Sequence, residues 1–366
     1  MRVGLAVSLA VAAAPLLAAS PPADPNAVLA RWDKDEHPDL RGVVVLRDGR
    51  QIAERYYNGA RADELHDIRS AGKSVTALLV GIAIDRGAIR SLDDPVARYW
   101  TAAAGSAAGA VPLRDVLTMR SGLAADDDDP ASPGNEDRMD AAADPLAFAR
   151  AVPRADPPGA RYRYNSLTAY VAGIVVAEAT GMRMADFARR HLFAPLGIAR
   201  WRWDADAAGV TKGQGNLRLT TGGLATLGEM VRSGGRWRGR RIVASAWIAD
   251  MLAPKVGIAA ADPYADGYGY FWYSRAQRIG DATIPVSFAS GNGGNKIYVV
   301  PACRLVVAVT SSAYGRGYGQ RRSEAILRAV LETQVAAGSC GPHGLSAAIP
   351  GPAPAPHTRA GTPPSR

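Results

Sequence analysis

Residues 70–84 read SAGKSVTALLVGIAI and form the most informative stretch of the chain. Their apolar run is nearly unbroken and ends near Gly87, which predicts a helix that is buried on all sides. Ser70 and Lys73 stand in its first turn, and residues three positions apart share a helix face, so the amine can reach the hydroxyl. This arrangement predicts a nucleophilic serine with an adjacent base at the start of a central helix.

The chemistry of Ser70 depends on its surroundings, because a serine hydroxyl is a weak nucleophile until a neighbouring base takes its proton. Burial lowers the pKa of a lysine, so Lys73 is predicted to serve as that base near neutral pH. Backbone N–H groups at the helix N-terminus also point toward developing negative charge. His66 is close in sequence, but the chain has no GxSxG motif, and we expect His66 to hydrogen-bond locally.

The flanking sequence changes from strand patterns to helix patterns and back. A hairpin is predicted at residues 42–57, with its turn at Asp48 and Gly49. Helices are predicted at residues 167–179, 184–192, 221–232, 245–252 and 320–335, and strands at 268–274, 283–290, 296–301 and 304–312. We therefore expect an α+β fold in which helices flank an antiparallel sheet built from both ends of the chain. An all-helical subdomain is expected at about residues 70–210, with the site in the cleft between the two parts.

Two other segments carry groups that could serve a nucleophile at Ser70. Tyr164 and Ser166 precede an apolar helix, and the Tyr164 hydroxyl could relay a proton if it lies near Lys73. The sequence ASGNGG at residues 289–294 ends a predicted strand, where glycines allow close approach of a substrate and backbone N–H groups could bind an oxyanion. Taken singly, such a tyrosine is more often a core residue and such glycines a β-bulge.

The order of these motifs resembles that of the serine β-lactamase and penicillin-binding-protein superfamily. The resemblance is closest to its class C β-lactamase-like branch, which includes esterases and 6-aminohexanoate-oligomer hydrolases. Similar blocks extend from Arg41 to about Val335 and include LRDVLTMRSGL, PGARYRYNSLTAYVAGIVVAEATG, TTGGLATLG and ASGNGGNKIYVVP. The resemblance implies a serine hydrolase with the fold given above and with no metal or organic cofactor.

The resemblance also implies roles for individual residues. Ser70 would be acylated with Lys73 as its base partner, and Tyr164 would carry protons to the leaving group and help to activate water. The backbone N–H groups of Ser70 and Asn292 would form the oxyanion hole. The remaining substrate-binding positions would be held by Ser166, Ser290 and Gly291.

Two departures from the family pattern bear on the substrate. Ser166 stands where β-lactamases usually have an Asn that holds an amide carbonyl, and Ala289 stands where they usually have Lys or His. That cation normally helps to bind a substrate carboxylate, so its loss should weaken carboxylate recognition unless Lys296 or a nearby Arg replaces it. We therefore expect an enzyme acting on small ester, amide or peptide-like substrates rather than an efficient β-lactamase.

Two alternatives remain open from the sequence. One is a true β-lactamase or D-stereospecific peptidase of the same superfamily, and the other is a non-catalytic protein that binds cell-wall fragments. An acidic stretch at residues 126–140 could attract an amine-bearing substrate if it lies near the cleft, although charge runs are usually solvated loops. Tyr270 and Trp272 are candidates for the cleft wall, although most strand aromatics belong to the core.

Composition and charge exclude other classes. The chain has 366 residues, of which 48% are hydrophobic, so it can bury a large core. Its 2 Cys and 5 His are too few for a four-thiolate or multi-histidine metal centre. The net charge is +9, but the basic residues are scattered and do not alternate with aromatics, so no nucleic-acid partner is expected.

The two ends of the chain differ from the rest. Residues 1–22 have a basic start and an apolar run too short to span a bilayer, which predicts a signal peptide rather than an anchor. The mature protein is then expected to be periplasmic or secreted, without stable membrane insertion. The hydrolase domain is expected at residues 23–340, followed by a disordered Pro-rich tail at 341–366. Cys303 and Cys340 either form one disulfide in such a compartment or remain separate thiols.

Overall fold

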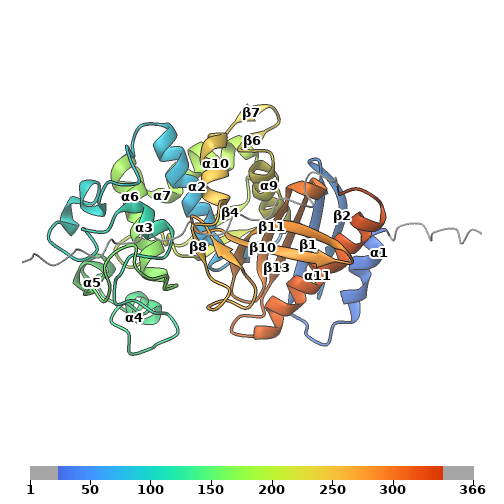
Figure 1. The fold of residues 1–366 in the computed structure, drawn as a ribbon, viewed down its shortest axis with the longest axis horizontal. Coiled ribbons are helices and arrows are strands. Elements are labelled where there is room, and N and C mark those ends of the chain that lie inside the picture. The colour runs from blue at the N-terminus through green and yellow to red at the C-terminus, as the bar shows by residue number, and fades with distance from the viewer. Residues whose placement is uncertain (1–23, 341–366) are drawn as a thin grey trace, which may run out of the picture.

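The computed structural model describes residues 24–340, so the predicted signal peptide and Pro-rich tail lie outside the described residues. Within that range the chain forms an eight-stranded antiparallel sheet with the order β2-β1-β13-β12-β11-β10-β9-β8 (Figure 1). Its strands are β1 (Leu40–Arg47), β2 (Arg50–Tyr56), β8 (Val256–Gly257), β9 (Gly267–Tyr268), β10 (Tyr273–Ile279), β11 (Ala282–Gly291), β12 (Asn295–Val300) and β13 (Leu305–Ser311). A smaller sheet contains β3 (His66–Asp67), β5 (Leu217–Leu219) and β4 (Trp201–Trp203), and a short hairpin contains β6 (Arg236–Trp237) and β7 (Arg240–Arg241).

The helices stand between and around these strands. In chain order they are α1 (Pro25–Leu29), α2 (Ala71–Asp85), α3 (Leu113–Leu117), α4 (Glu136–Asp140), α5 (Pro145–Ala151), α6 (Ser166–Thr180), α7 (Met184–Ala188), α8 (Ala194–Leu196), α9 (Thr221–Arg232), α10 (Ser245–Leu252) and α11 (Gly317–Ala336). None of the helices in residues 24–340 has the length and apolar character needed to cross a membrane.

The first and last strands of the chain lie side by side in the large sheet. β1 pairs with β13 in antiparallel register, with Val44 opposite Ala308, and β2 completes the predicted hairpin. Every residue of β13 is buried, because α9 packs on β1, β12 and β13 while α11 packs on β10, β12 and β13. A Val-rich strand of this kind is typical of a sheet that is covered on both faces. The α+β fold expected from the sequence is confirmed.

α2 is the buried central helix that the sequence predicts. It contacts α6 and α10 as well as β11 and β12, so it joins the sheet to the helices α3–α7, which lie at the left of Figure 1. Gly81 lets α10 approach closely, because a Cβ at this position would lie 2.2 Å from the ring of Trp247. The first turn of α2 therefore lies where the helical region meets the sheet.

The strand predicted at residues 268–274 is wrong. The chain reverses within this segment, so that β9 pairs antiparallel with β10. Gly269 has no room for a side chain, because a Cβ would lie 2.2 Å from the carbonyl oxygen of Met251, and Phe271 adopts a φ of 55°. Aromatic residues favour strands locally, and this preference hides the turn from a sequence pattern.

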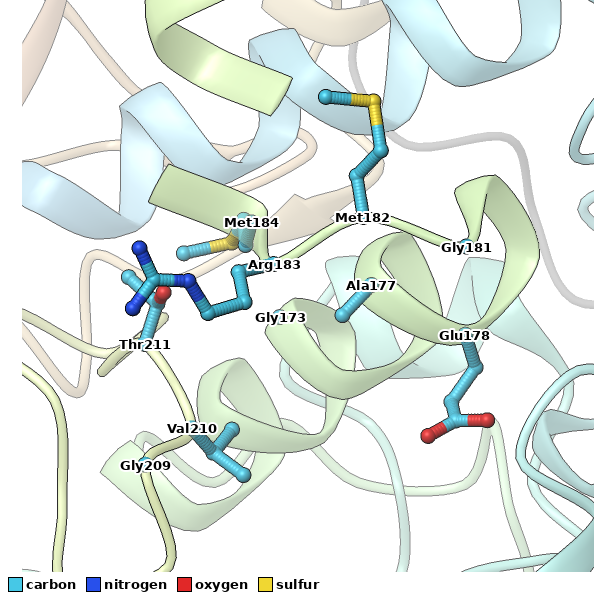
Figure 2. A pocket seen from close by; sticks show the side chains of 10 residues that line it. All are labelled: Gly173, Ala177, Glu178, Gly181, Met182, Arg183, Met184, Gly209, Val210 and Thr211. Carbon is cyan, nitrogen blue, oxygen red and sulfur yellow. The ribbon is translucent and has the colours of Figure 1, made fainter. Parts of the chain in front are cut away.

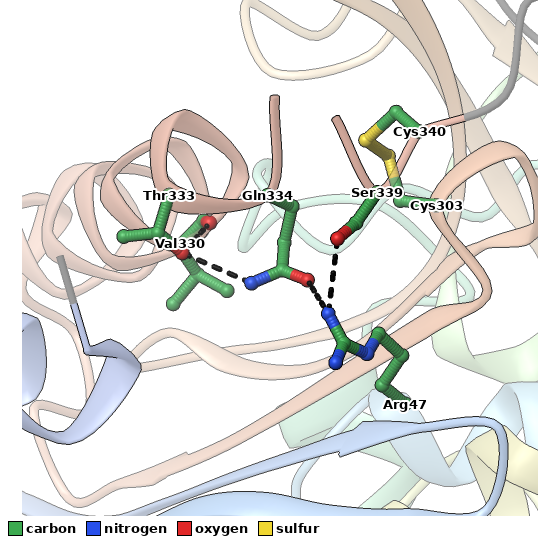
Figure 3. Close-up of a disulfide and its surroundings, with 7 residues drawn as sticks. All are labelled: Arg47, Cys303, Val330, Thr333, Gln334, Ser339 and Cys340. Carbon is green, nitrogen blue, oxygen red and sulfur yellow. Dashed lines mark hydrogen bonds between the residues drawn. A yellow bond between two sulfur atoms is a disulfide. The ribbon is translucent and has the colours of Figure 1, made fainter. Parts of the chain in front are cut away.

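A disulfide joins Cys303 to Cys340, which decides between the alternatives that the sequence leaves open (Figure 3). Cys303 lies in a short 3-10 helix between β12 and β13, and Cys340 follows the end of α11. Beside it, the Arg47 guanidinium donates to Gln334 Oε1 at 3.1 Å and to Ser339 Oγ at 3.0 Å. The bond and these contacts hold the end of α11 against the sheet.

Candidate active site

Ser70 and Lys73 form a hydrogen-bonded pair at the start of α2. The Lys73 ammonium donates to Ser70 Oγ at 2.9 Å, as the three-residue spacing predicts. It also donates to Ser166 Oγ at 3.0 Å, and only 2% of Lys73 is exposed. The cation is therefore held between two hydroxyl groups, one of which belongs to the predicted nucleophile.

The N-terminus of α6 brings Tyr164 and Ser166 to this pair. Asn165 caps the helix, and its side chain accepts a hydrogen bond from the Thr168 backbone N–H at 2.7 Å. Tyr164 and Ser166, on either side of Asn165, then point toward α2. The Lys73 ammonium lies 4.9 Å from the centre of the Tyr164 ring. The structure thus brings together two pairs of residues, Ser70 with Lys73 and Tyr164 with Ser166, although 93 positions separate Lys73 from Ser166.

The end of β11 lies against the first turn of α2. A Cβ on Gly291 would lie 2.0 Å from the Ile68 carbonyl oxygen and 3.1 Å from the Ala71 nitrogen, so a glycine is required for this approach. Asn292 is fixed next to it, because its Oδ1 accepts a hydrogen bond from the Gly315 N–H at 2.7 Å. Within the described residues, the backbone N–H groups of Ser70 and Asn292 donate to no protein acceptor. Both predicted oxyanion donors are therefore available to a ligand.

The charge state of Lys73 corrects one expectation from the sequence. Burial alone would lower the pKa of Lys73, but Tyr164, Glu136 and Asp127 favour the ammonium and raise its pKa above the ordinary value. The prediction that this pKa is lowered is wrong, because it considered burial without Tyr164 and the acidic loop. Lys73 is a protonated cation at neutral pH.

Asp127 is the member of the acidic stretch with the closest link to this site. Burial raises its pKa to about 6, while Lys73 and Ser166 oppose that shift and Glu136 adds to it. Its Oδ1 is buried and accepts no hydrogen bond from the described residues. The sequence marks the acidic stretch as a whole, but only the fold shows that Asp127 and Glu136 are near enough to the buried lysine to favour its charge.

These residues surround a cleft of about 610 Å³. Of the predicted site residues, its walls contain Ser70, Tyr164, Ser290, Gly291 and Asn292. The acidic residues that line it are Asp126, Asp127, Asp128, Glu136 and Asp262, and the basic ones are Arg163, Lys296 and Arg316. The acidic stretch therefore reaches the cleft in part.

The aromatic wall of the cleft differs from the one expected. Tyr270 and Trp272 do not line it, because Tyr270 stacks on Trp247 and the Trp272 indole donates to the Ser74 carbonyl inside the core. The tyrosines that do line the cleft are Tyr162, Tyr164, Tyr264 and Tyr273. Two of these come from the segment before α6, which the sequence marks only through Tyr164.

A second lysine lies in the same cleft. Lys296 of β12 stands opposite Ser290 of β11, and its ammonium donates to Ser290 Oγ at 2.7 Å. Burial lowers the pKa of Lys296 to about 8. From the sequence, Lys296 is considered only as a replacement for the cation missing at Ala289. Its contact with Ser290 follows from the register between β11 and β12.

Another hollow, of about 300 Å³, lies between the end of α6, the start of α7 and residues 209–211 (Figure 2). Its charged residues, Glu178 and Arg183, extend away from each other in that view. None of the predicted site residues lines it. The cleft at Ser70 is therefore the candidate active site.

The order of strands and helices and the Ser70 cleft can now be compared with known proteins. The family model described as Beta-lactamase matches residues 34–331. The chain belongs to the β-lactamase family. Membership of this family indicates a serine hydrolase.

Relatives in the β-lactamase family differ in how much of the chain they match. The chain is 31% identical over 225 residues to the 6-aminohexanoate-dimer hydrolase of Paenarthrobacter ureafaciens, a match that covers 57% of this chain and 56% of that protein. A penicillin-binding protein homologue from Caulobacter crescentus has a similar structure, with a TM-score of 0.67 at 19% identity over 86% of this chain and 99% of that one. A class C β-lactamase from Rhodobacter sphaeroides has a TM-score of 0.61 at 18% identity over 83% and 98%. These two structural likenesses concern the fold alone.

Proposed function

We propose that this chain hydrolyses ester or amide bonds through an acyl-enzyme formed on Ser70. The observation that carries the proposal is the 2.9 Å hydrogen bond between the Lys73 ammonium and Ser70 Oγ at the wall of the cleft. A serine in this contact can give up its proton as its oxygen attacks a carbonyl carbon. A protein that only binds a ligand has no use for such a pair.

The path of the proton follows from the charge of Lys73. Because its pKa is raised, Lys73 accepts the Ser70 proton only as it gives one of its own away. Tyr164, with its ring centre 4.9 Å from the ammonium, is the proposed carrier to the leaving oxygen or nitrogen. The bond from Ser70 Oγ to the carbonyl carbon forms and the bond to the leaving group breaks. The leaving group departs with the proton, and Lys73 remains an ammonium.

The second half of the reaction uses the same groups. Water attacks the acyl carbonyl, its proton returns to Ser70 Oγ through Tyr164 and Lys73, and the acid is released. In both halves the carbonyl oxygen becomes negative, and the free N–H groups of Ser70 and Asn292 are proposed to bind it.

The substrate class is proposed from the cleft and from one relative. The 6-aminohexanoate-dimer hydrolase, whose own length is matched over 56%, acts on a dimer of an amino acid, which is an amide. A cleft of about 610 Å³ with acidic and basic walls has room for a small amide or ester that carries charge. Ala289 is fully buried, so this position supplies no cation to the cleft.

A kinetic comparison of the wild type with Ser70→Ala tests the proposal. On p-nitrophenyl esters and p-nitroanilides, the wild type should show steady turnover, with a burst of product on any substrate whose acyl-enzyme forms faster than it is hydrolysed, and Ser70→Ala should show neither. Nitrocefin in the same panel tests the β-lactamase alternative. Equal turnover by a folded Ser70→Ala protein would contradict the acyl-enzyme mechanism.

We also propose that the protein is exported. The predicted signal peptide at residues 1–22 suggests export, and the Cys303–Cys340 disulfide supports it because such bonds persist in oxidising compartments. Intact-mass measurement of the protein from the native host's extracytoplasmic fraction should show loss of the leader and of two hydrogens. A full-length, fully reduced protein in the cytoplasmic fraction would contradict export.

A further inference from the structure

Lys296 is a buried cation without an anionic partner. Only 2% of the residue is exposed, and its ammonium donates to one protein acceptor among the described residues, Ser290 Oγ at 2.7 Å. It takes part in none of the ion pairs formed within residues 24–340. A buried charge is normally paired, because removing it from water costs several kcal/mol.

The groups that face Lys296 do not supply the missing charge. The ring centres of Phe288 and Tyr298 lie 4.7 Å and 5.9 Å from the ammonium. Asp262 and Glu324 favour the charged lysine from further away, and Arg275 opposes them. Glu324 is already bound to Arg275 at 3.0 Å. The environment is therefore mostly aromatic, and among the described residues neither Asp262 nor Glu324 forms an ion pair with Lys296.

Lys296 nevertheless lines the cleft that contains Ser70. Lys296 and Ser290 occupy opposite positions on β12 and β11, and both line that cleft. One residue beyond Ser290, Gly291 meets the first turn of α2. A ligand group bound at Ser290 would therefore lie close to a substrate carbonyl that is positioned for attack by Ser70.

We propose that Lys296 and Ser290 form an anion subsite that selects substrates with a carboxylate beside the scissile ester or amide bond. Since Ser290 Oγ accepts from Lys296, its own hydrogen is directed elsewhere and can be donated to the carboxylate, while the ammonium provides the opposite charge. Ala289, which faces the core, has no part in this subsite. The inference rests on the proposed hydrolysis at Ser70 and adds its substrate class.

Matched substrates test the subsite on both sides of the scissile bond. One pair is p-nitrophenyl hydrogen glutarate and its methyl ester, and the other is 4-acetoxybenzoate and its methyl ester. For each pair, the ratio of kcat/KM values measures the preference for the carboxylate. Lys296→Met should lower that ratio about tenfold or more on at least one pair, mainly through KM, and Lys296→Arg should restore part of it.

Controls separate this role from a structural one. Lys255→Met, which removes a lysine paired with Asp250 outside the cleft, should leave the ratio unchanged. In the wild type, KM for the carboxylated substrate should rise as the pH passes about 8 and Lys296 loses its proton, while KM for the methyl ester should not follow. Ser290→Ala provides a second variant if Lys296→Met does not fold, and it should lower the ratio in the same direction.

The outcomes distinguish the subsite from the hydrolase itself. An unchanged ratio in folded Lys296→Met and Ser290→Ala proteins, or an equal loss on both members of each pair, would overturn the anion subsite. Absence of any turnover in the wild type would instead overturn the proposed hydrolysis. In that case binding of glutarate, measured by calorimetry with wild type and Lys296→Met, still tests the subsite, and equal binding by both would overturn it.

Discussion

One cleft contains two serine–lysine pairs that differ in their surroundings. Lys73 and Lys296 are each 2% exposed, and they donate to serine hydroxyl groups at 2.9 Å and 2.7 Å. Burial acts against the charge of both, but Tyr164, Glu136 and Asp127 raise the pKa of Lys73, whereas burial prevails at Lys296 and lowers its pKa to about 8. The same two residue types at similar distances therefore have different electrostatics, which are set by the side chains around them.

The position of each pair in the fold indicates its role. Ser70 lies at the N-terminus of α2, where free backbone N–H groups can stabilise an oxyanion, and Tyr164, the proposed proton carrier, lies beside Lys73. Ser290 lies within a paired strand, and the ring nearest to the Lys296 ammonium is that of Phe288, which has no hydroxyl group. We therefore assign chemistry to the first pair and recognition to the second.

The largest expected effect separates the two serines. Ser70→Ala should lower kcat/KM for any substrate by on the order of a thousandfold or more, because no nucleophile remains. Ser290→Ala should cost on the order of tenfold, through KM for carboxylated substrates. Steady-state kinetics of both variants measures this difference, and equal losses would break the distinction between the pairs.

Removing the lysine of the catalytic pair should give the next largest effect. Lys73→Met takes away the proton relay, so kcat should fall on the order of a hundredfold while KM changes little. The matched comparison is Lys296→Met on the same carboxylated ester, where the loss should reside in KM. A KM effect at Lys73 with unchanged kcat would reverse the two assignments.

Replacing Asp127 should have a smaller effect, which is seen in the free energy of unfolding. Burial raises its folded-state pKa to about 6, above the ordinary 3.8, so the folded protein binds a proton that the unfolded chain has released. Folding stability attributable to Asp127 is therefore lost as the pH rises from about 4 to 6. Asp127→Asn should be more stable than the wild type at pH 7.5 by on the order of 1–3 kcal/mol, with no difference at pH 4. Urea unfolding at both pH values measures this, and a variant less stable at pH 7.5 would show that the carboxylate is stabilising.

The disulfide offers a change that should leave both pairs intact. Cys303→Ser with Cys340→Ser opens a loop with a sequence separation of 37, which should cost about 3–4 kcal/mol of stability. Neither cysteine lines the cleft, so kcat/KM at 25 °C should stay within about twofold. Thermal unfolding and steady-state kinetics test the two parts, and a selective loss of carboxylate preference would show that the sheet transmits strain to Lys296.

The contrast between the pairs also shows what the sequence can reveal. Ser70 and Lys73 are visible because their spacing follows the helix period, and the apolar run after them predicts the buried helix. Tyr164 and Asn292 are found through motif order. The partnership of Ser290 with Lys296 depends on the register between β11 and β12, which no local pattern gives.

Electrostatics set a second limit on prediction from sequence. The raised pKa of Lys73 depends on Tyr164, Glu136 and Asp127, which only the fold brings near the lysine. The turn at Gly269 and Phe271 escapes prediction for a related reason, since its contacts with the Met251 carbonyl are tertiary. Local propensity indicated a strand there, and tertiary packing overrode it.

The most direct test of the two assignments is to locate the adduct of a small fluorophosphonate by peptide mass mapping. The wild type and Lys296→Met should each carry one adduct on Ser70, and Ser70→Ala should carry none, because the Lys296 pair does not activate Ser290 as a nucleophile. An adduct on Ser290 in the wild type would contradict the account.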